Sequence, residues 1–186
     1  MKNSGFSLLE VMIAMALLSM LSAGLYTFLL VSENALREND SLAQLESETL
    51  TAIEKICNDL LKCTDNAASG WTLTPSSFAA DIIDGYDYDT SSNTYGDTVA
   101  WSLAYSDGET NNGADDNGNN LVDEMTLTRS VNGVGVVVCD HVAEDGLTLS
   151  KNGKVITISL SLQGYVLQSN KTLTKTISPI TVTLRN

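Results

Sequence analysis

The chain has 186 residues, 43% of them hydrophobic, which suits one domain with a sizeable core plus additional segments. Its formal net charge of −13 and pI of about 4.2 argue against nucleic-acid binding through a basic patch. The acid is unevenly placed, because no lysine or arginine occurs between Lys62 and Arg129, where many aspartates and glutamates fall. This acidic stretch is either a solvated surface or the site of a cation.

An uncharged segment from Val11 to Val31 lies near the start of the chain. As an α-helix it would rise about 32 Å, which is enough to cross the hydrocarbon core of a bilayer. Lys2 precedes the segment and Glu33 follows it, a bias that predicts a cytoplasmic N-terminus and export of the remaining chain. A cleaved secretory signal would have a shorter apolar core, of about 7–15 residues. A plain membrane anchor explains the segment but gives no role to Glu10.

The opening GFSLLEVMIAMALLS, with its short basic leader MKNSG, resembles the type III signal of the type IV pilin superfamily. The resemblance implies that prepilin peptidase cleaves between Gly5 and Phe6, removing a leader of residues 1–5, and that Phe6 becomes N-methylated. It also implies that Glu10 sets the register between subunits by pairing with a neighbour's N-terminal ammonium. Such a partner is needed, because a charge within a membrane costs about 2.5–3.5 kcal/mol even on lenient scales. One departure is that the first proline is Pro75, whereas major pilins often carry a helix-kinking proline at mid-membrane.

The helix is predicted to continue to about Lys62. Leu42, Leu45, Ile53, Ile56 and Leu60 recur on one helical face. The polar side is predicted to hold Glu46, Glu48, Glu54, Lys55, Asn58 and Asp59. The helix therefore divides into a transmembrane or filament-core half, residues 6–32, and an amphipathic half, residues 33–64.

Residues 65–186 are predicted to form a β-rich head domain on the periplasmic or extracellular side, beginning with irregular structure over 65–97. Asn132-Gly133 and Asn152-Gly153 are two-residue hairpin signals, and Pro179 predicts a bulge or an edge strand. The predicted strands are Thr98–Tyr105, Met125–Val131, Val134–Cys139, Leu147–Lys151, Lys154–Leu162 and Thr172–Leu184. The fold class is α+β, with a mostly antiparallel sheet packed on the amphipathic half of the helix.

A stretch rich in Asp, Asn and Gly, NNGADDNGNNLVDE, connects two predicted strands. With Gly118 at the sixth position of an EF-hand-type loop, Glu124 falls at the twelfth, although Gly113 occupies the first. The stretch resembles short calcium loops of extracellular proteins, while the alternative is a merely soluble turn. The candidate Ca²⁺ ligands are Asn112, Asp115, Asp116, Asn117, Asn119, Asp123 and Glu124.

Three cysteines, Cys57, Cys63 and Cys139, would lie in an oxidising compartment. Cys57 and Cys63 are too far apart on one helix for a bridge. We therefore predict a disulfide from the helix to Cys139, with Cys63 preferred to Cys57, the alternative being buried thiols. Strand alternation would place Cys139 and His141 on one face, but nothing else supplies a catalytic signature, so we expect no enzymatic activity.

Within the superfamily, the sequence resembles minor pilins of type IV pili and J-type minor pseudopilins of type II secretion. The resemblance implies a subunit that helps to initiate or cap a filament, located in the bacterial inner membrane before assembly and then in a pilus or pseudopilus at the cell surface. The implied partners are prepilin peptidase, other minor and major pilins or pseudopilins, and the inner-membrane assembly platform. A major pilin and a calcium-dependent adhesive or ligand-binding pilin remain open alternatives.

Overall fold

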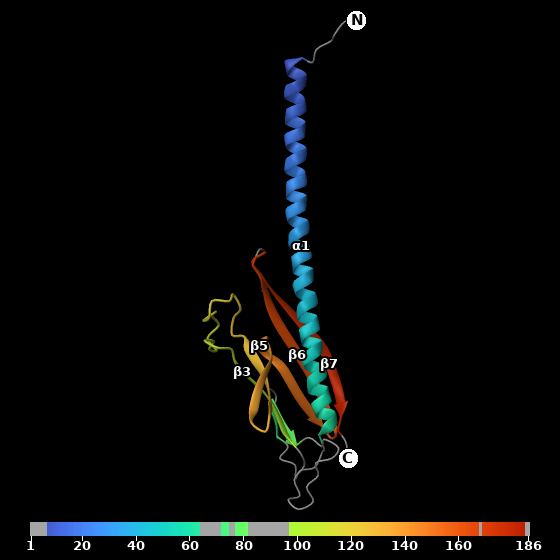
Figure 1. The fold of residues 1–186 in the computed structure, drawn as a ribbon, viewed down its shortest axis with the longest axis vertical. Helices are drawn as coiled ribbons and strands as arrows, with labels where there is room; N and C mark the ends of the chain where they lie inside the picture. Colours follow the sequence, from blue (N-terminus) through green and yellow to red (C-terminus); the bar gives the residue numbers. More distant parts are fainter. Residues whose placement is uncertain (1–6, 64–71, 75–76, 82–96, 168, 185–186) are drawn as a thin grey trace, which may run out of the picture. The chain divides into compact units, whose positions relative to one another are not determined.

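The computed structural model describes residues 7–63, 72–74, 77–81, 97–167 and 169–184. The predicted processing residues Gly5 and Phe6 lie outside these ranges, as does most of the predicted irregular stretch 65–97. Within that stretch the prediction is wrong at Thr72–Thr74 and Ser77–Asp81, which form two short paired strands. The chain divides into two compact units, Met1–Asp40 and Ser41–Asn186. One helix, α1 (Leu8–Lys62), supplies the first unit and the start of the second, and its C-terminal end confirms the predicted boundary (Figure 1).

In the first unit, α1 begins with a side-chain cap. Ser7 Oγ accepts a hydrogen bond from the backbone N–H of Glu10 at 3.2 Å. Ser7 and Glu10 have the Ser-x-x-Glu spacing of a capping box, in which an acidic residue in the first turn also faces the positive end of the helix dipole. Glu10 therefore has a local role in the helix besides the one that the sequence implies.

The described residues contain one helix that is long and apolar enough to cross a membrane, with a window of mean hydropathy 2.1 that is 0% buried. The serine and threonine hydroxyl groups in this segment are bonded within the helix itself. Ser19, Ser22 and Thr27 donate to backbone carbonyls three or four residues earlier, at 2.8, 2.8 and 2.9 Å respectively. Such internal bonding suits a lipid environment, where water cannot satisfy polar groups.

In the second unit, the final part of α1 packs its apolar face on an antiparallel sheet (Figure 1). Leu45, Ile53, Ile56 and Leu60 are buried as predicted, and Leu42 is partly buried against them. The sheet has the order β1-β2-β3-β4-β5-β6-β7, with each strand antiparallel to its neighbours. The strands are β1 (Thr72–Thr74), β2 (Ser77–Asp81), β3 (Thr98–Tyr105), β4 (Met125–Val131), β5 (Val134–Asn152), β6 (Val155–Val166) and β7 (Lys171–Thr183). The α+β class is confirmed.

Asp59 departs from the predicted polar face, because the residue is buried, with 5% of its surface exposed. Its carboxylate accepts hydrogen bonds from Trp101 Nε1 at 2.8 Å and from Arg129 Nε and Nη2 at 2.7 and 2.9 Å. The hydrogen bond to Asp59 raises the pKa of Arg129 further above its ordinary value. This three-residue cluster ties the end of α1 to β3 and β4.

The first predicted hairpin is confirmed. Val131 pairs with Val134, and both Asn132 and Gly133 have positive φ angles, of 51° and 82°, as a type I′ turn requires. The second turn is displaced by one residue from the prediction. Asn152 itself pairs with Val155, so the turn is formed by Gly153 and Lys154.

β5 is longer than the two strands predicted in its place because irregularities at two places interrupt its pairing without ending it. The first is opposite β4, where register shifts lie between Met125 and Leu127 and between Leu127 and Thr128. The second lies between Val142 and Leu147. On β7, a register shift coincides with the predicted bulge at Pro179, and β7 is also the last strand of the sheet.

Gly146 occupies the second irregularity of β5 and leaves no room for a side chain. A Cβ atom there would lie 2.6 Å from the backbone oxygens of both Ala143 and Ser161. We expect Gly146→Ala to lower the free energy of unfolding by about 1–3 kcal/mol, because backbone atoms must shift. Gly135→Ala on the same strand is the matched control, since its Cβ would meet a single methyl group of Thr128 at 3.2 Å. Urea unfolding of the two variants gives the comparison, and equal losses would contradict the steric assignment.

Candidate functional site

Glu10 lies on an exposed face of the membrane-length part of α1. Val11, Ala14, Met15 and Leu18 form an apolar surface beside it on the same helix. The next charged residue along the chain is Glu33, which forms an ion pair with Arg37 at 2.8 Å. This arrangement can receive a cationic group that is itself attached to apolar structure.

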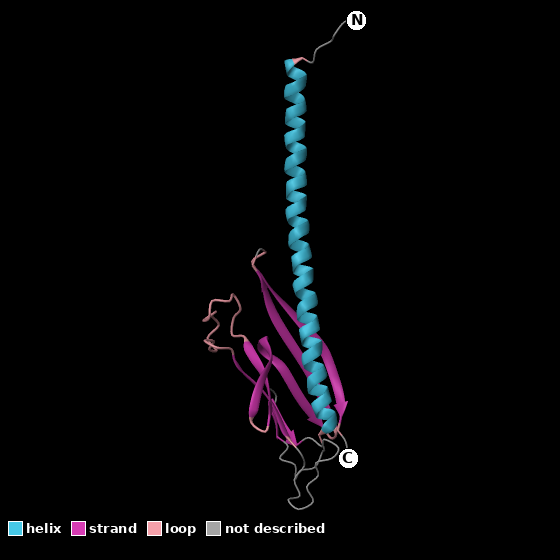
Figure 2. Cartoon of the chain, in the orientation of Figure 1, coloured by secondary structure: helices cyan, strands magenta, loops and turns pink. Residues whose placement is uncertain are grey.

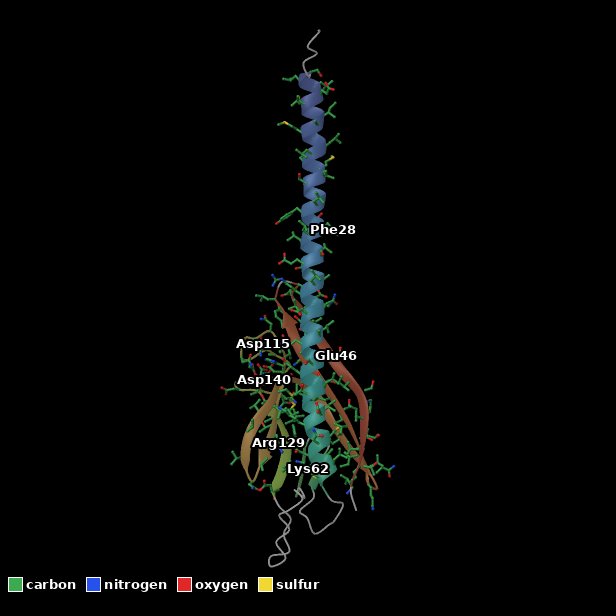
Figure 3. The ribbon with its side chains drawn as sticks, turned by 45° about the vertical axis from the view of Figure 1, so that its right-hand side comes forward. Phe28, Glu46, Lys62, Asp115, Arg129 and Asp140 are labelled. Carbon is green, nitrogen blue, oxygen red and sulfur yellow. The ribbon has the colours of Figure 1, made fainter. Side chains whose placement is uncertain are left out.

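The predicted calcium loop is the connection between β3 and β4, drawn as a long loop in Figure 2. The backbone N–H of Ser106 donates to the carbonyl of Glu124 at 3.0 Å and closes the base of the loop. Asp115, labelled in Figure 3, accepts the backbone N–H groups of residues 118, 119 and 120 at 2.6 to 3.1 Å. Asp123 accepts those of Asn112 and Gly113 at 3.1 and 2.8 Å. These two carboxylates therefore shape the backbone of the loop.

Asp116 lies on the surface of the same loop. Its carboxylate accepts hydrogen bonds from Thr110 Oγ1 at 2.6 Å and from Asn112 Nδ2 at 2.8 Å, and these bonds lower the pKa of Asp116. Among the described residues, no three Asp, Glu, His or Cys side chains converge closely enough to hold a metal ion. The four predicted acidic ligands are therefore not brought together as the EF-hand pattern would require.

Two glutamates are buried in this otherwise exposed loop. Glu124 is fully buried, and its Oε1 accepts the side-chain amides of Asn117 and Asn119 at 2.7 and 2.6 Å. Glu109 is 6% exposed, and its Oε1 accepts the backbone N–H groups of Asp116 and Asn117 at 3.1 and 3.0 Å. Glu109 was not among the predicted ligands because it precedes the twelve residues of the EF-hand pattern.

The predicted disulfide is absent, since the structure forms no disulfide bond among Cys57, Cys63 and Cys139. The Sγ of Cys63 is directed along its own helix and donates to the carbonyl of Asp59 at 3.2 Å. Cys139 is buried in the core, where loss of solvation raises the pKa of its thiol to about 12. Burial also raises the pKa of Cys57. All three therefore match the alternative of thiols held in or near the core.

The predicted shared face of Cys139 and His141 is wrong. The irregularity in β5 gives His141 a positive φ of 67° and leaves its side chain exposed, while Cys139 is buried. A protonated, buried thiol beside an exposed imidazole on another face does not form a nucleophile and base pair.

Comparison with known proteins gives one match, at the N-terminus. Residues 1–26 match the family described as the prokaryotic N-terminal methylation motif. No curated protein and no solved structure matches the chain. The matched residues include Gly5, Phe6 and Glu10, and they run into the exposed apolar part of α1. Together, the motif and the apolar helix fit membrane anchoring before assembly. The chain thus carries the N-terminal methylation motif typical of type IV pilins and pseudopilins, which supports its membership of the type IV pilin superfamily.

Proposed function

We propose that the chain is a minor pilin-like subunit that prepilin peptidase processes and that helps to initiate, or caps, a type IV pilus-like filament. The observation that carries this proposal is the methylation motif over residues 1–26, joined to a helix whose apolar window is wholly exposed. The motif by itself fits a pilin or pseudopilin equally well. A minor pseudopilin of a type II secretion system is therefore the second candidate.

The proposed assembly step transfers the apolar half of α1 from lipid into a bundle of like helices. Lipid tails are as apolar as these side chains, so close packing and paired polar groups must supply the association energy. In the proposed bundle, the carboxylate of Glu10 provides the polar interaction. It accepts a hydrogen bond from the N-terminal ammonium of a processed neighbour, whose first residue would be Phe6. The exposed apolar surface of Val11, Ala14, Met15 and Leu18 beside Glu10 would pack against the aromatic ring next to that ammonium.

The proposed low copy number is supported by the charge of the head domain. The chain carries a formal net charge of −13, and most of the excess acid lies after Lys62. Identical acidic heads repeated along a filament would repel one another, which disfavours a major, filament-building role. An adhesive pilin is a further alternative, and it would require binding of a surface or sugar that chelator abolishes.

Mass spectrometry of the membrane fraction tests processing, and mass spectrometry of sheared filaments tests copy number. In membranes we expect a chain that begins at methylated Phe6 in wild-type cells and at Met1 in cells without prepilin peptidase. We also expect far fewer copies of this chain than of the most abundant subunit. A mature chain that still begins at Met1 would contradict membership of this processing pathway. A copy number equal to that of the main subunit would contradict the minor role alone.

A further inference from the structure

The two buried glutamates of the β3–β4 connection each have one oxygen without a partner. Glu109 Oε2 and Glu124 Oε2 are both buried and accept no hydrogen bond. A buried carboxylate oxygen that nothing compensates is strongly unfavourable, and native proteins pair such groups or bind metal ions with them. These atoms therefore require a counterpart.

Both glutamates converge on one residue, Asn117. Its backbone N–H donates to Glu109 at 3.0 Å, and its side-chain amide donates to Glu124 at 2.7 Å. Two carboxylates are thus held on either side of a single residue. Residues 106–124 contain no lysine, arginine or histidine that could balance their charge. A cation from solution could supply the missing positive charge.

A pocket of about 300 Å³ gives such a cation access to Glu124. Asn117 and Asn119 line it beside Glu124, together with the hydroxyl-bearing Ser106 and Thr126 and the carboxylates of Asp107 and Asp140. The imidazole of His141 also lines this pocket, 3.7 Å from the carboxylate of Asp140. Asp140, labelled in Figure 3, comes from β5 and not from the loop. Most of these polar groups are oxygen donors, which hard cations prefer over sulfur and nitrogen.

We propose that the β3–β4 connection binds one divalent cation, calcium, through Glu109 and Glu124. Calcium accepts six to eight oxygen ligands in irregular geometry, whereas magnesium requires a near-ideal octahedron that a long loop rarely provides. The aspartates of the sequence-based set act differently, since Asp115 and Asp123 hold the loop backbone in shape. With few carboxylates in direct contact, the site belongs to the weak class of extracellular modules, with dissociation constants of about 10⁻⁴–10⁻³ M.

The test uses the full-length chain in detergent micelles, freed of metal and titrated with CaCl₂ or MgCl₂. Binding is followed by calorimetry, and the melting temperature is followed by circular dichroism. The variants are Glu124→Gln and Glu109→Gln, which keep the shape of each side chain. Asp116→Asn is the matched control, because it removes one charge from the same loop at an exposed carboxylate.

For the wild-type chain, free Ca²⁺ at 100 times its dissociation constant is expected to raise the melting temperature by about 5–10 °C. Each glutamine variant is expected to weaken Ca²⁺ binding roughly ten-fold or more, and the Asp116→Asn control by roughly three-fold or less. In EDTA, Glu124→Gln is expected to melt at or above the wild-type temperature, because it removes a buried charge that then has no counterion. That result would also show that the variant is folded.

Three results would overturn the proposal. The first is a wild-type melting temperature that is the same in EDTA and in Ca²⁺, with no heat of binding. The second is a loss of Ca²⁺ affinity in Asp116→Asn as large as that in Glu124→Gln. That result would assign Ca²⁺ binding to the exposed aspartates. The third is equal stabilisation by MgCl₂, which would contradict the choice of ion. None of these results bears on processing at Phe6, so the proposed function is tested separately.

Discussion

The Glu10→Val variant is expected to insert into the inner membrane normally but to enter filaments roughly 100-fold less than the wild-type chain. Without the carboxylate, a neighbour's N-terminal ammonium would lie unpaired among apolar side chains. A charge in that setting costs about 2.5–3.5 kcal/mol, which corresponds to a factor of about 100 in an equilibrium. Quantitative immunoblots of the membrane fraction and of sheared filaments measure the two quantities.

Ser7 and Glu10 also have the spacing of a capping box, so helix capping must be separated from pairing between subunits. Ser7→Ala removes the hydroxyl that accepts the N–H of Glu10 but leaves the carboxylate in place. Glu10→Gln keeps a side chain suited to the capping box but removes the charge. If pairing matters, Ser7→Ala assembles and Glu10→Gln does not. The opposite result would assign the effect of Glu10 to the start of the helix.

Removing Asp59 is expected to have the largest effect on stability. Asp59→Ala leaves Trp101 Nε1 and the Arg129 guanidinium without the acceptor that they share. Breaking a buried ion pair from one side costs about 3–5 kcal/mol, and we expect about 3 kcal/mol because the side chain of Arg129 is 32% exposed. Urea unfolding of the full-length chain in detergent, followed by tryptophan fluorescence, measures this loss.

A double-mutant cycle shows whether the loss comes from the pair itself. Asp59→Ala combined with Arg129→Met is expected to lose less than the sum of the two single variants, because neither partner is then left unpaired. Glu54→Ala is the control, since Glu54 is exposed on the same helix five residues earlier. Its change should stay within about 0.5 kcal/mol. Strict additivity of Asp59 and Arg129 would argue against a direct interaction.

Periodicity was enough to predict the helix, its buried face, β3, β4 and the first hairpin. Each of these depends on residues close together in the sequence, such as Val99 and Trp101 alternating inward on β3. Periodicity could not predict that Asp59 is buried, because its partner Arg129 is 70 residues away in the sequence. A charged residue on a helix is assigned to the polar side unless a distant partner is known.

β5 shows where alternation fails. Cys139 and Val142 are both buried although they are three residues apart, and the positive φ of His141 between them accommodates the extra residue. The EF-hand pattern likewise did not include Glu109, because this residue, which the structure buries with a hydrogen bond to Asn117, lies outside the span of that pattern. Local spacing predicted the loop as the candidate site, and only three-dimensional packing showed which carboxylates lack partners.

The internally bonded hydroxyl groups of Ser19, Ser22 and Thr27 have a mechanical consequence. Because these three groups are already paired, they need no hydrogen-bond partners on a neighbouring helix, so neighbouring helices can slide or rotate against one another at little energetic cost. Resistance to such sliding must then be concentrated at Glu10, near one end of the helix. A filament built from such rods would yield gradually under tension and return to a single alignment when the tension is released.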